Sequence, residues 1–181
     1  GPTGSPIGSP TTLVLADELS EAAIIDAVRH GRTMVQLQGP DGPALDVTMR
    51  TRTGGTAQIG DDVDAVVRAQ LTVHVTGGAG TFAQLWRDGV QLDQVAITGD
   101  DVTTELADDP GPGNYRYRVE LSAGANQRLI VTSHFYVQAV GAVGGCGCGT
   151  TGSPGDAAWL AALALPWLRR RRRRARGALS P

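Results

Sequence analysis

The feature that most constrains the fold is a series of short segments in which apolar and polar residues alternate. A period of two places one set of side chains on a buried face of a strand and the other set toward solvent. The segments, separated by turn residues, are Ala44–Thr51, Ala69–Val75, Thr81–Trp86, Val90–Ile97, Val102–Leu106, Tyr115–Leu121 and Leu129–Val137. About seven strands at this spacing predict a mainly β protein with an immunoglobulin-like β-sandwich.

Two glycine-containing stretches between these segments are interpreted as hairpin connections. Arg87-Asp88-Gly89 has the composition of a tight turn, because glycine adopts positive φ without strain. The glycine-rich stretch Gly77–Gly80 is expected to join its flanking strands in the same way.

The N-terminal part of the chain has a different pattern, and residues 1–37 are expected to hold a strand–helix–strand unit. Thr11–Leu15 and Thr33–Leu37 are β-branched and apolar runs, which are typical of strands. Between them, Ser20 suits the N-cap of a helix and Gly31 suits the position just after its end.

Two packing contacts are predicted for this helix. Leu19, which precedes the cap, and Ile24 are expected to form a hydrophobic staple. Ile24, Ala27 and Val28 recur at the spacing of one helix face and are expected to form its buried stripe. The sandwich is then expected to occupy residues 38–143.

The C-terminal region, residues 144–181, joins two cysteines, a polar spacer, an apolar run and a basic block. The apolar residues are Ala157, Trp159, Leu160, Leu163, Leu165, Trp167 and Leu168. The arginines after them are Arg169, Arg170, Arg171, Arg172, Arg173, Arg174 and Arg176. A C-terminal apolar helix is expected here, and the arginine cluster is expected to stay cytoplasmic and to stop transfer through a bilayer.

The apolar run Ala157–Leu168 is short for a membrane span. Its twelve residues include Pro166. At 1.5 Å per residue a helix of this length covers about 18 Å, whereas the hydrocarbon core of a bilayer is about 30 Å thick. The run is therefore expected to be a transient signal and not a lasting anchor.

The cysteines Cys146 and Cys148 are separated by one glycine and are the only two in the chain. A disulfide across so short a loop is strained, and a metal site needs further ligands nearby. With the apolar run and the arginines, residues 144–177 closely resemble the MYXO-CTERM sorting signal of exported myxobacterial proteins. The resemblance implies that Cys146 and Cys148 are the processing or lipidation site. It also implies a processing protease as partner, export, and attachment to the membrane at the cell surface or outer membrane.

Two other interpretations of the basic tail remain open. One is a disordered tail that binds nucleic acid, and the other is a packed amphipathic helix capped by arginines. The charge distribution argues against a nucleic-acid partner for the body of the protein. Residues 1–145 carry a net charge of −8 and the remainder carries +6, and an acidic surface repels phosphate backbones.

A second resemblance covers residues 6 to about 137. Gly8–Ser20, followed by Ala27–Thr33, is similar to the end of the catalytic barrel in PHP-domain metallohydrolases of the CehA-like branch. The loop Gly39–Pro43 and the hairpin Trp86–Gly89 match later passages of such proteins. The resemblance implies that an upstream PHP barrel is a partner of this region. It also implies that the parent protein binds Zn or Mn ions and hydrolyses phosphoesters or related esters.

The metal-binding motifs of that family do not occur in this chain. It contains neither His-x-His nor Asp-x-His, and its histidines are His30, His74 and His134, far apart in sequence. None of them can be assigned a catalytic or metal-binding role from the resemblance. We therefore expect no enzymatic activity, no catalytic residues and no cofactor in this chain.

Two weaker signals remain. Acidic residues gather at Asp61–Asp64, Asp100–Asp101 and Asp108–Asp109, where they are either solvated turns or oxygen ligands for Ca²⁺. Ser133 and His134 are adjacent in a predicted strand, so their side chains point to opposite faces and cannot form a nucleophile–base pair.

The expected function is that of a noncatalytic C-terminal region of a surface-anchored PHP-type hydrolase. No N-terminal signal peptide is visible, and an exported protein needs one, so we expect a longer parent protein. Two alternatives remain: a stand-alone surface adhesion or binding module with the same tail, and a gene that has lost its catalytic half.

Overall fold

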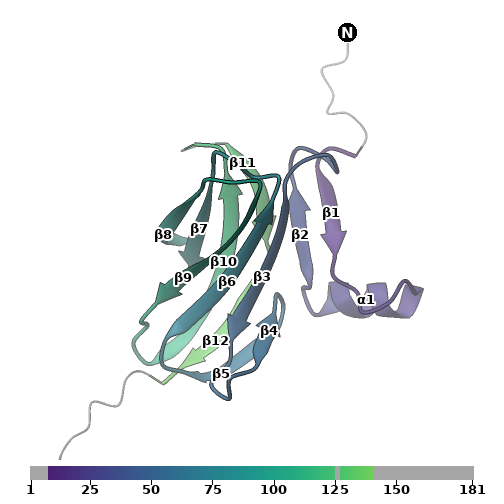
Figure 1. Ribbon diagram of the computed structural model, residues 1–181. Coiled ribbons are helices and arrows are strands. Elements are labelled where there is room, and N and C mark those ends of the chain that lie inside the picture. Colours follow the sequence, from purple (N-terminus) through teal and green to yellow (C-terminus); the bar gives the residue numbers. More distant parts are fainter. Residues whose placement is uncertain (1–7, 125–126, 141–181) are drawn as a thin grey trace, which may run out of the picture. The chain divides into compact units, whose positions relative to one another are not determined.

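The computed structural model describes residues 8–124 and 127–140, which form two facing β-sheets and one helix (Figure 1). The mainly β character and the sandwich predicted from the alternation are confirmed. The predicted C-terminal helix and arginine cluster lie outside the described residues. The division of the chain at residues 37 and 143 stays a prediction.

The larger sheet has eight strands, with β10 in the middle. Its members are β1 (Thr11–Val14), β2 (Thr33–Gln36), β5 (Asp62–Val66), β7 (Thr81–Arg87), β8 (Val90–Ile97), β10 (Gly113–Ser122), β11 (Arg128–Thr132) and β12 (Phe135–Ala139). One edge of β10 pairs with β7, and the other pairs with β12 and then β11. β7 continues to β8, β11 continues to β2 and β1, and β12 continues to β5.

The smaller sheet is antiparallel and has the order β4-β3-β6-β9. Its strands are β3 (Ala44–Arg50), β4 (Thr56–Gln58), β6 (Ala69–Thr76) and β9 (Asp101–Asp108). β4 and β5 were not predicted, because three residues in β4 and five in β5 are too few to show a clear alternation.

The core between the sheets follows the predicted period of two. The alternate residues of β3 and β6 that face it are Leu45, Val47, Met49, Leu71, Val73 and Val75. From the larger sheet, β10 contributes Tyr117, Val119 and Leu121. Each fully buried side chain of this kind contributes about 1.5–3 kcal/mol relative to exposure, so this alternation is the main source of stability.

The predicted strand Leu129–Val137 is instead two strands, β11 and β12, which are separated at Ser133 and His134. At the break, the hydroxyl of Thr132 accepts the N–H of Val119 over 3.0 Å in place of a strand carbonyl. The carbonyl of His134 accepts the N–H of Gly60 over 2.8 Å. The break therefore replaces ladder bonds with a side-chain hydrogen bond to β10 and a backbone hydrogen bond to the β4–β5 loop.

The two predicted hairpin connections have different outcomes. Asp88 and Gly89 both have positive φ, 49° and 86°, and join β7 to β8 as predicted. Positive φ at both residues matches the twist of the strands that a two-residue hairpin loop joins. Gly77–Gly80 is not a hairpin connection, because it carries the chain from β6 in the smaller sheet to β7 in the larger sheet.

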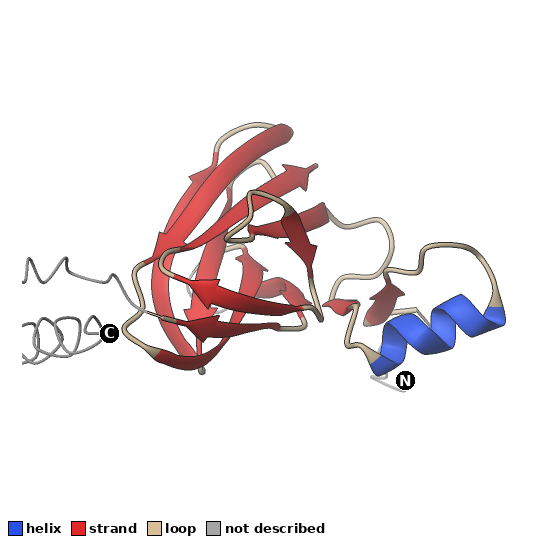
Figure 2. Ribbon diagram, turned by 90° about the horizontal axis from the view of Figure 1, so that it is seen from below, coloured by secondary structure: helices blue, strands red, loops and turns tan. Residues whose placement is uncertain are grey.

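The predicted helix is confirmed as α1 (Glu21–Arg29), and the hydroxyl of Ser20 caps it by accepting the N–H of Ala23 over 3.2 Å. The staple is wrong, because Leu19 is 97% exposed. The buried stripe is also wrong except at Ala27, since Ile24 and Val28 are exposed. β1 is the edge strand of the larger sheet, and α1 lies at its end beyond the facing sheets (Figures 1 and 2). No second described layer therefore covers the helix.

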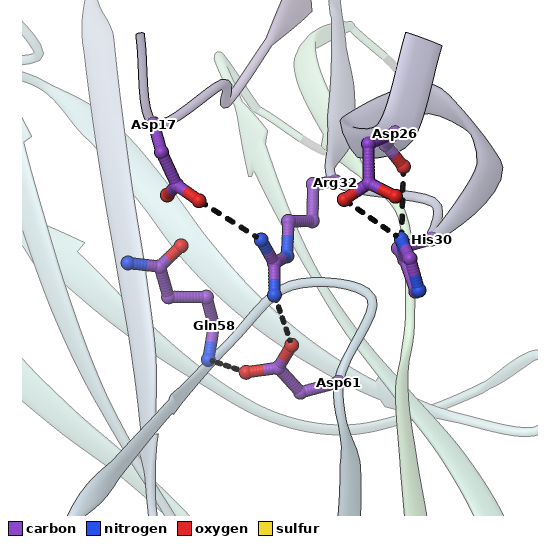
Figure 3. A network of polar contacts seen from close by, with 6 residues as sticks. All are labelled: Asp17, Asp26, His30, Arg32, Gln58 and Asp61. Carbon is purple, nitrogen blue, oxygen red and sulfur yellow. Dashed lines mark hydrogen bonds and ion pairs between the residues drawn. The ribbon is translucent and has the colours of Figure 1, made fainter. Parts of the chain in front are cut away.

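Arg32 joins this N-terminal unit to the sandwich (Figure 3). Its guanidinium lies 3.8 Å from the carboxylate of Asp17 and 3.2 Å from that of Asp61. Asp61, in the loop between β4 and β5, also accepts the backbone N–H of Gln58 over 2.8 Å. Together with the β2–β11 ladder, this network fixes the position of α1.

Candidate functional site

The outer face of the larger sheet carries a groove with a mixed polar and apolar lining, which we call the Trp86 groove. Its lining residues are Leu37, Gln84, Trp86, Gln91, Ser122, Gln127 and Arg128. They come from β8, β7, β10 and the start of β11, with Leu37 directly after β2. The groove therefore crosses the strands instead of following one of them.

Alternation along β10 produces the polar face of the groove. Because Val119 and Leu121 point into the core, Arg118, Glu120 and Ser122 point outward. In the register with β7, Arg118 lies opposite Trp86, Glu120 opposite Gln84, and Ser122 opposite Phe82. Directly opposite residues on one face are close enough for their side chains to interact.

Trp86 lies beside two arginines that share one carboxylate. The guanidinium carbons of Arg118 and Arg128 are 5.3 Å and 5.9 Å from the centre of the indole ring, within the range of cation–π attraction. The Nε atoms of Arg118 and Arg128 donate to Glu120 over 2.8 Å and 2.7 Å. Glu120 is only 1% exposed, and a buried carboxylate of this kind requires such partners.

Two buried polar atoms of the groove have no hydrogen-bond partner among the described residues. They are the indole Nε1 of Trp86 and the hydroxyl of Ser122, whose residue is 2% exposed. Leaving a buried donor unpaired costs about 1–3 kcal/mol. Most buried polar groups of native proteins are paired, so these two atoms are exceptions, and both belong to residues that line the groove.

A second groove lies on the other half of the larger sheet. It is lined by Asp62, Asp64, Asp88, Asn114, Tyr115, Arg116, Tyr136, Val137 and Gln138. Asp88 accepts the backbone N–H of Arg116 over 3.0 Å and lies 3.6 Å from its guanidinium. This arginine offsets part of the acidic charge of the second groove.

The acidic clusters considered for Ca²⁺ are partly engaged in contacts of their own. Asp61 pairs with Arg32, as described above, and Asp109 pairs with Arg68 over 2.8 Å. Asp108 accepts from both Arg87 and Tyr117. In residues 8–124 and 127–140, no group of three or more His, Cys, Asp or Glu side chains is arranged to hold a metal ion.

The three histidines lie in separate surroundings. His30 lies 3.3 Å from the carboxylate of Asp26, one helical turn earlier (Figure 3), and His74 lies 2.8 Å from that of Asp101. Burial lowers the pKa of His134, and the charges of nearby arginines lower it further. The described residues therefore do not fit the Zn or Mn ions that the PHP resemblance implies for the parent protein.

The predicted processing and membrane residues lie outside the described residues. They are Cys146, Cys148, the apolar run Ala157–Leu168 and the arginines from Arg169 to Arg176. Within the described ranges, none of the helices has the length and apolar character needed to cross a membrane.

The helix unit exposes several large apolar side chains, which we call the α1 surface. Its members are Leu13, Leu19, Ile24, Ile25 and Val28, all at least 36% exposed. Ile24 and Val28 are one turn apart, and Ile25 and Val28 are three residues apart, so these three are neighbours on the helix. A helix normally buries such residues against another layer.

Sequence reasoning did not identify the Trp86 groove. Trp86 was predicted as the end of the strand Thr81–Trp86 and as part of a hairpin motif, and the residues of β10 as alternating members of a strand. The available signal was the outward set Arg118, Glu120 and Ser122, in which two opposite charges and a hydroxyl share one face. The sequence of β10 alone does not indicate that β7 lies beside this set.

Comparisons of the chain with protein-family models, with curated proteins and with solved structures find no match. The two family resemblances therefore stay expectations. The function proposed below rests on those resemblances together with the side chains of the α1 surface and the Trp86 groove.

Proposed function

We propose that this chain is the noncatalytic C-terminal region of a surface-anchored PHP-type metal-dependent hydrolase. The parent protein is expected to act on phosphoesters or related esters. The α1 surface carries the proposal, because Leu19, Ile25 and Val28 are apolar and exposed on a unit that is firmly joined to the sandwich. Contiguous exposed apolar patches mark contacts with another protein or with a membrane, and we assign this one to a protein.

The occupant that we assign to the α1 surface is the upstream PHP barrel. The N-terminal unit resembles the passage that closes such a barrel, so its apolar helix face is expected to complete the barrel. The β2–β11 ladder and the contact between Arg32 and Asp61 would then hold the barrel against the sandwich. In this role the sandwich supports and spaces the catalytic part.

The arrangement of the strands supports an immunoglobulin-like type for the sandwich. β3, β6 and β9 are neighbours in one sheet, and β8, β7, β10 and β12 are neighbours in the other. Consecutive strands change sheets from β6 to β7 and from β9 to β10, as in Greek-key sandwiches. A sandwich of this type suits the proposed role, since it places loops at both ends of a rigid body.

The C-terminal tail supplies the location in this proposal. It directs export, is processed near Cys146 and Cys148, and attaches the protein to the cell surface or outer membrane. Its apolar run and arginine cluster have the order required of a stop-transfer signal. The processing protease of the sorting system is therefore one of the partners.

The reading frame upstream of Gly1 tests the proposal most directly. His-x-His and Asp-x-His motifs in that region would support it, and a signal peptide directly before Gly1 would contradict it. An assay of this chain with Mn²⁺ or Zn²⁺ and a model phosphodiester adds a second test. We expect no turnover above the metal-only control, and turnover by the chain would refute a noncatalytic role.

The alternative is a stand-alone surface adhesion or binding module. The Trp86 groove favours it, because an outer sheet face with unpaired buried polar atoms is suited to a ligand. In this alternative the N-terminal unit only extends the sheet. A signal peptide directly before Gly1 distinguishes this function from the first.

A further inference from the structure

We propose that the Trp86 groove binds a saccharide chain. The groove combines the flat indole of Trp86, the amides of Gln84 and Gln91, and the hydroxyl of Ser122. An indole offers an apolar face together with a polar N–H. A sugar ring has the matching chemistry, since its C–H groups form apolar patches and its hydroxyls both donate and accept.

The shape of the groove suits an extended chain of several sugar units. Its lining reaches from Gln91 on β8, across β7, β10 and β11, to Leu37 after β2. These five strands are neighbours, and neighbouring strands lie about 4.8 Å apart, so the groove crosses about 19 Å of sheet. A single small molecule would occupy only part of this length.

The unpaired atoms give the groove its polar specificity. The indole N–H of Trp86 can donate to a sugar oxygen, and the hydroxyl of Ser122 can donate or accept. Both atoms are covered by their neighbours, so a ligand reaches them only when a side chain moves aside. Arg128 lines the same groove and has a half-exposed side chain. It can turn outward and admit the ligand while Arg118 keeps Glu120 paired.

A peptide is less suited to this groove than a saccharide. Extended peptides usually bind sheets by adding a strand to an open edge, where main-chain groups are unpaired. β7, β10 and β11 each have a strand on both sides, so the groove presents side chains and no open edge.

Nucleic acid is also less suited. Glu120 accepts from both Arg118 and Arg128, which leaves a single excess positive charge in this cluster. The surrounding body is acidic, whereas nucleic-acid sites depend on several free cations that face phosphates.

Calorimetric titration of the full chain tests the proposal. The probes are linear tetrasaccharides of β-1,4-glucose, β-1,4-N-acetylglucosamine and α-1,4-galacturonate, and a glycan array extends the range. We expect saturable binding of at least one linear saccharide. Trp86→Ala should weaken the binding by about tenfold or more, the ratio that corresponds to 1.4 kcal/mol.

Matched variants separate this site from general surface binding. Tyr136→Ala removes an exposed aromatic ring from the second groove and should leave the affinity unchanged. If Trp86→Ala does not fold, as judged by its melting curve, Trp86→Phe keeps a ring and removes only the N–H. It should still weaken binding by several-fold.

Three results would overturn the proposal: no binding to any saccharide on the array or in the titrations, equal affinity in the folded Trp86 variants, and loss of binding in Tyr136→Ala. The proposal does not depend on the PHP assignment. The upstream reading frame tests that assignment separately, so either inference can fail without the other.

Discussion

Gly60 faces the backbone carbonyl oxygen of His30 so closely that a Cβ on Gly60 would overlap that oxygen. Gly60 also has φ of 93°, a conformation that favours glycine. Its N–H donates to His134, so the glycine lies where the helix unit, the β4–β5 loop and the break between β11 and β12 meet. Glycine is therefore required here by both space and conformation.

We predict that Gly60→Ala destabilises the protein by more than the backbone conformation alone explains. The left-handed conformation costs a residue with a side chain about 1–2 kcal/mol, and steric overlap adds about 1–3 kcal/mol. Gly54→Ala is the control, because Gly54 has φ of 87° but open space around it. Chemical denaturation measures the unfolding free energy of both variants. Equal losses for the two variants would show that the contact with His30 is unimportant.

Tyr117→Phe should cost about 1.5–3 kcal/mol, the usual contribution of a hydrogen bond to a charged group. The Tyr117 hydroxyl, fully buried, donates to Asp108 over 2.6 Å, and Arg87 donates to the same oxygen over 2.6 Å. These contacts join β7, β9 and β10 across the two sheets. Tyr136→Phe, at a half-exposed position, should change the unfolding free energy by less than about 0.5 kcal/mol.

The same tyrosine predicts a loss of stability in alkali. Burial and the hydrogen bond to Asp108 raise the pKa of Tyr117 well above its ordinary value. Above about pH 10 the unfolded chain loses the phenolic proton while the folded protein keeps it. The folded state then binds more protons, so stability falls as the pH rises. Denaturation measured between about pH 8 and about pH 11 should show a smaller decrease in unfolding free energy for Tyr117→Phe than for the wild type.

His134 predicts a loss of stability in mild acid, a pH dependence opposite to that predicted for Tyr117. Burial, followed by the charges of Arg118 and Arg116, lowers its pKa in the folded protein. As the pH falls below about 6.5, the unfolded chain takes up a proton that the folded protein resists, and stability decreases. The contribution is fully present above that pH. His134→Gln should reduce the slope of unfolding free energy against pH in this range, and an unchanged slope would exclude His134 as its source.

The pair Arg32–Asp61 should be energetically coupled. Its side chains are 25% and 30% exposed, whereas those of Arg68 and Asp109 are 58% and 68% exposed. A double-mutant cycle to alanine should give a coupling near 1 kcal/mol for the first pair and a few tenths for the second. The reverse order would mean that Arg32 does not hold the N-terminal unit to the sandwich.

The tail prediction is tested by intact-mass measurement of the protein from its native host. We expect a mass that ends near Cys146 and Cys148, with or without an added lipid. The protein should also be found in the surface or outer-membrane fraction. A full-length C-terminus through Pro181 would contradict processing of the tail.

The strands could be predicted because their order of apolar and polar residues is a local property. Leu45, Val47 and Met49 are buried in β3, as the alternation predicts. β4 was missed because three residues contain too little of this pattern. The break at Ser133 and His134 depends on a hydroxyl that bonds a neighbouring strand, and no local pattern indicates it.

The Trp86 groove was not predictable for a related reason. Period two places Arg118 and Glu120 on one face of β10, but it does not indicate that β7 and Trp86 lie beside them. Only the long-range pairing of β10 with β7 places Trp86 beside these residues. The helix shows the converse error: its apolar spacing correctly indicates a face suited to burial, but the described residues supply no layer that covers Ile24 and Val28.

The position of β12 between β10 and β5 has a mechanical consequence for a chain that is held beyond Val140. β12 pairs antiparallel with β10 and parallel with β5, and the N–H of Val140 donates to Val66 over 2.9 Å. A pull along β12 therefore loads both ladders at once and in shear. Its bonds must break together and not one after another, so the strand that leads to the tail is built to resist a pull along its axis.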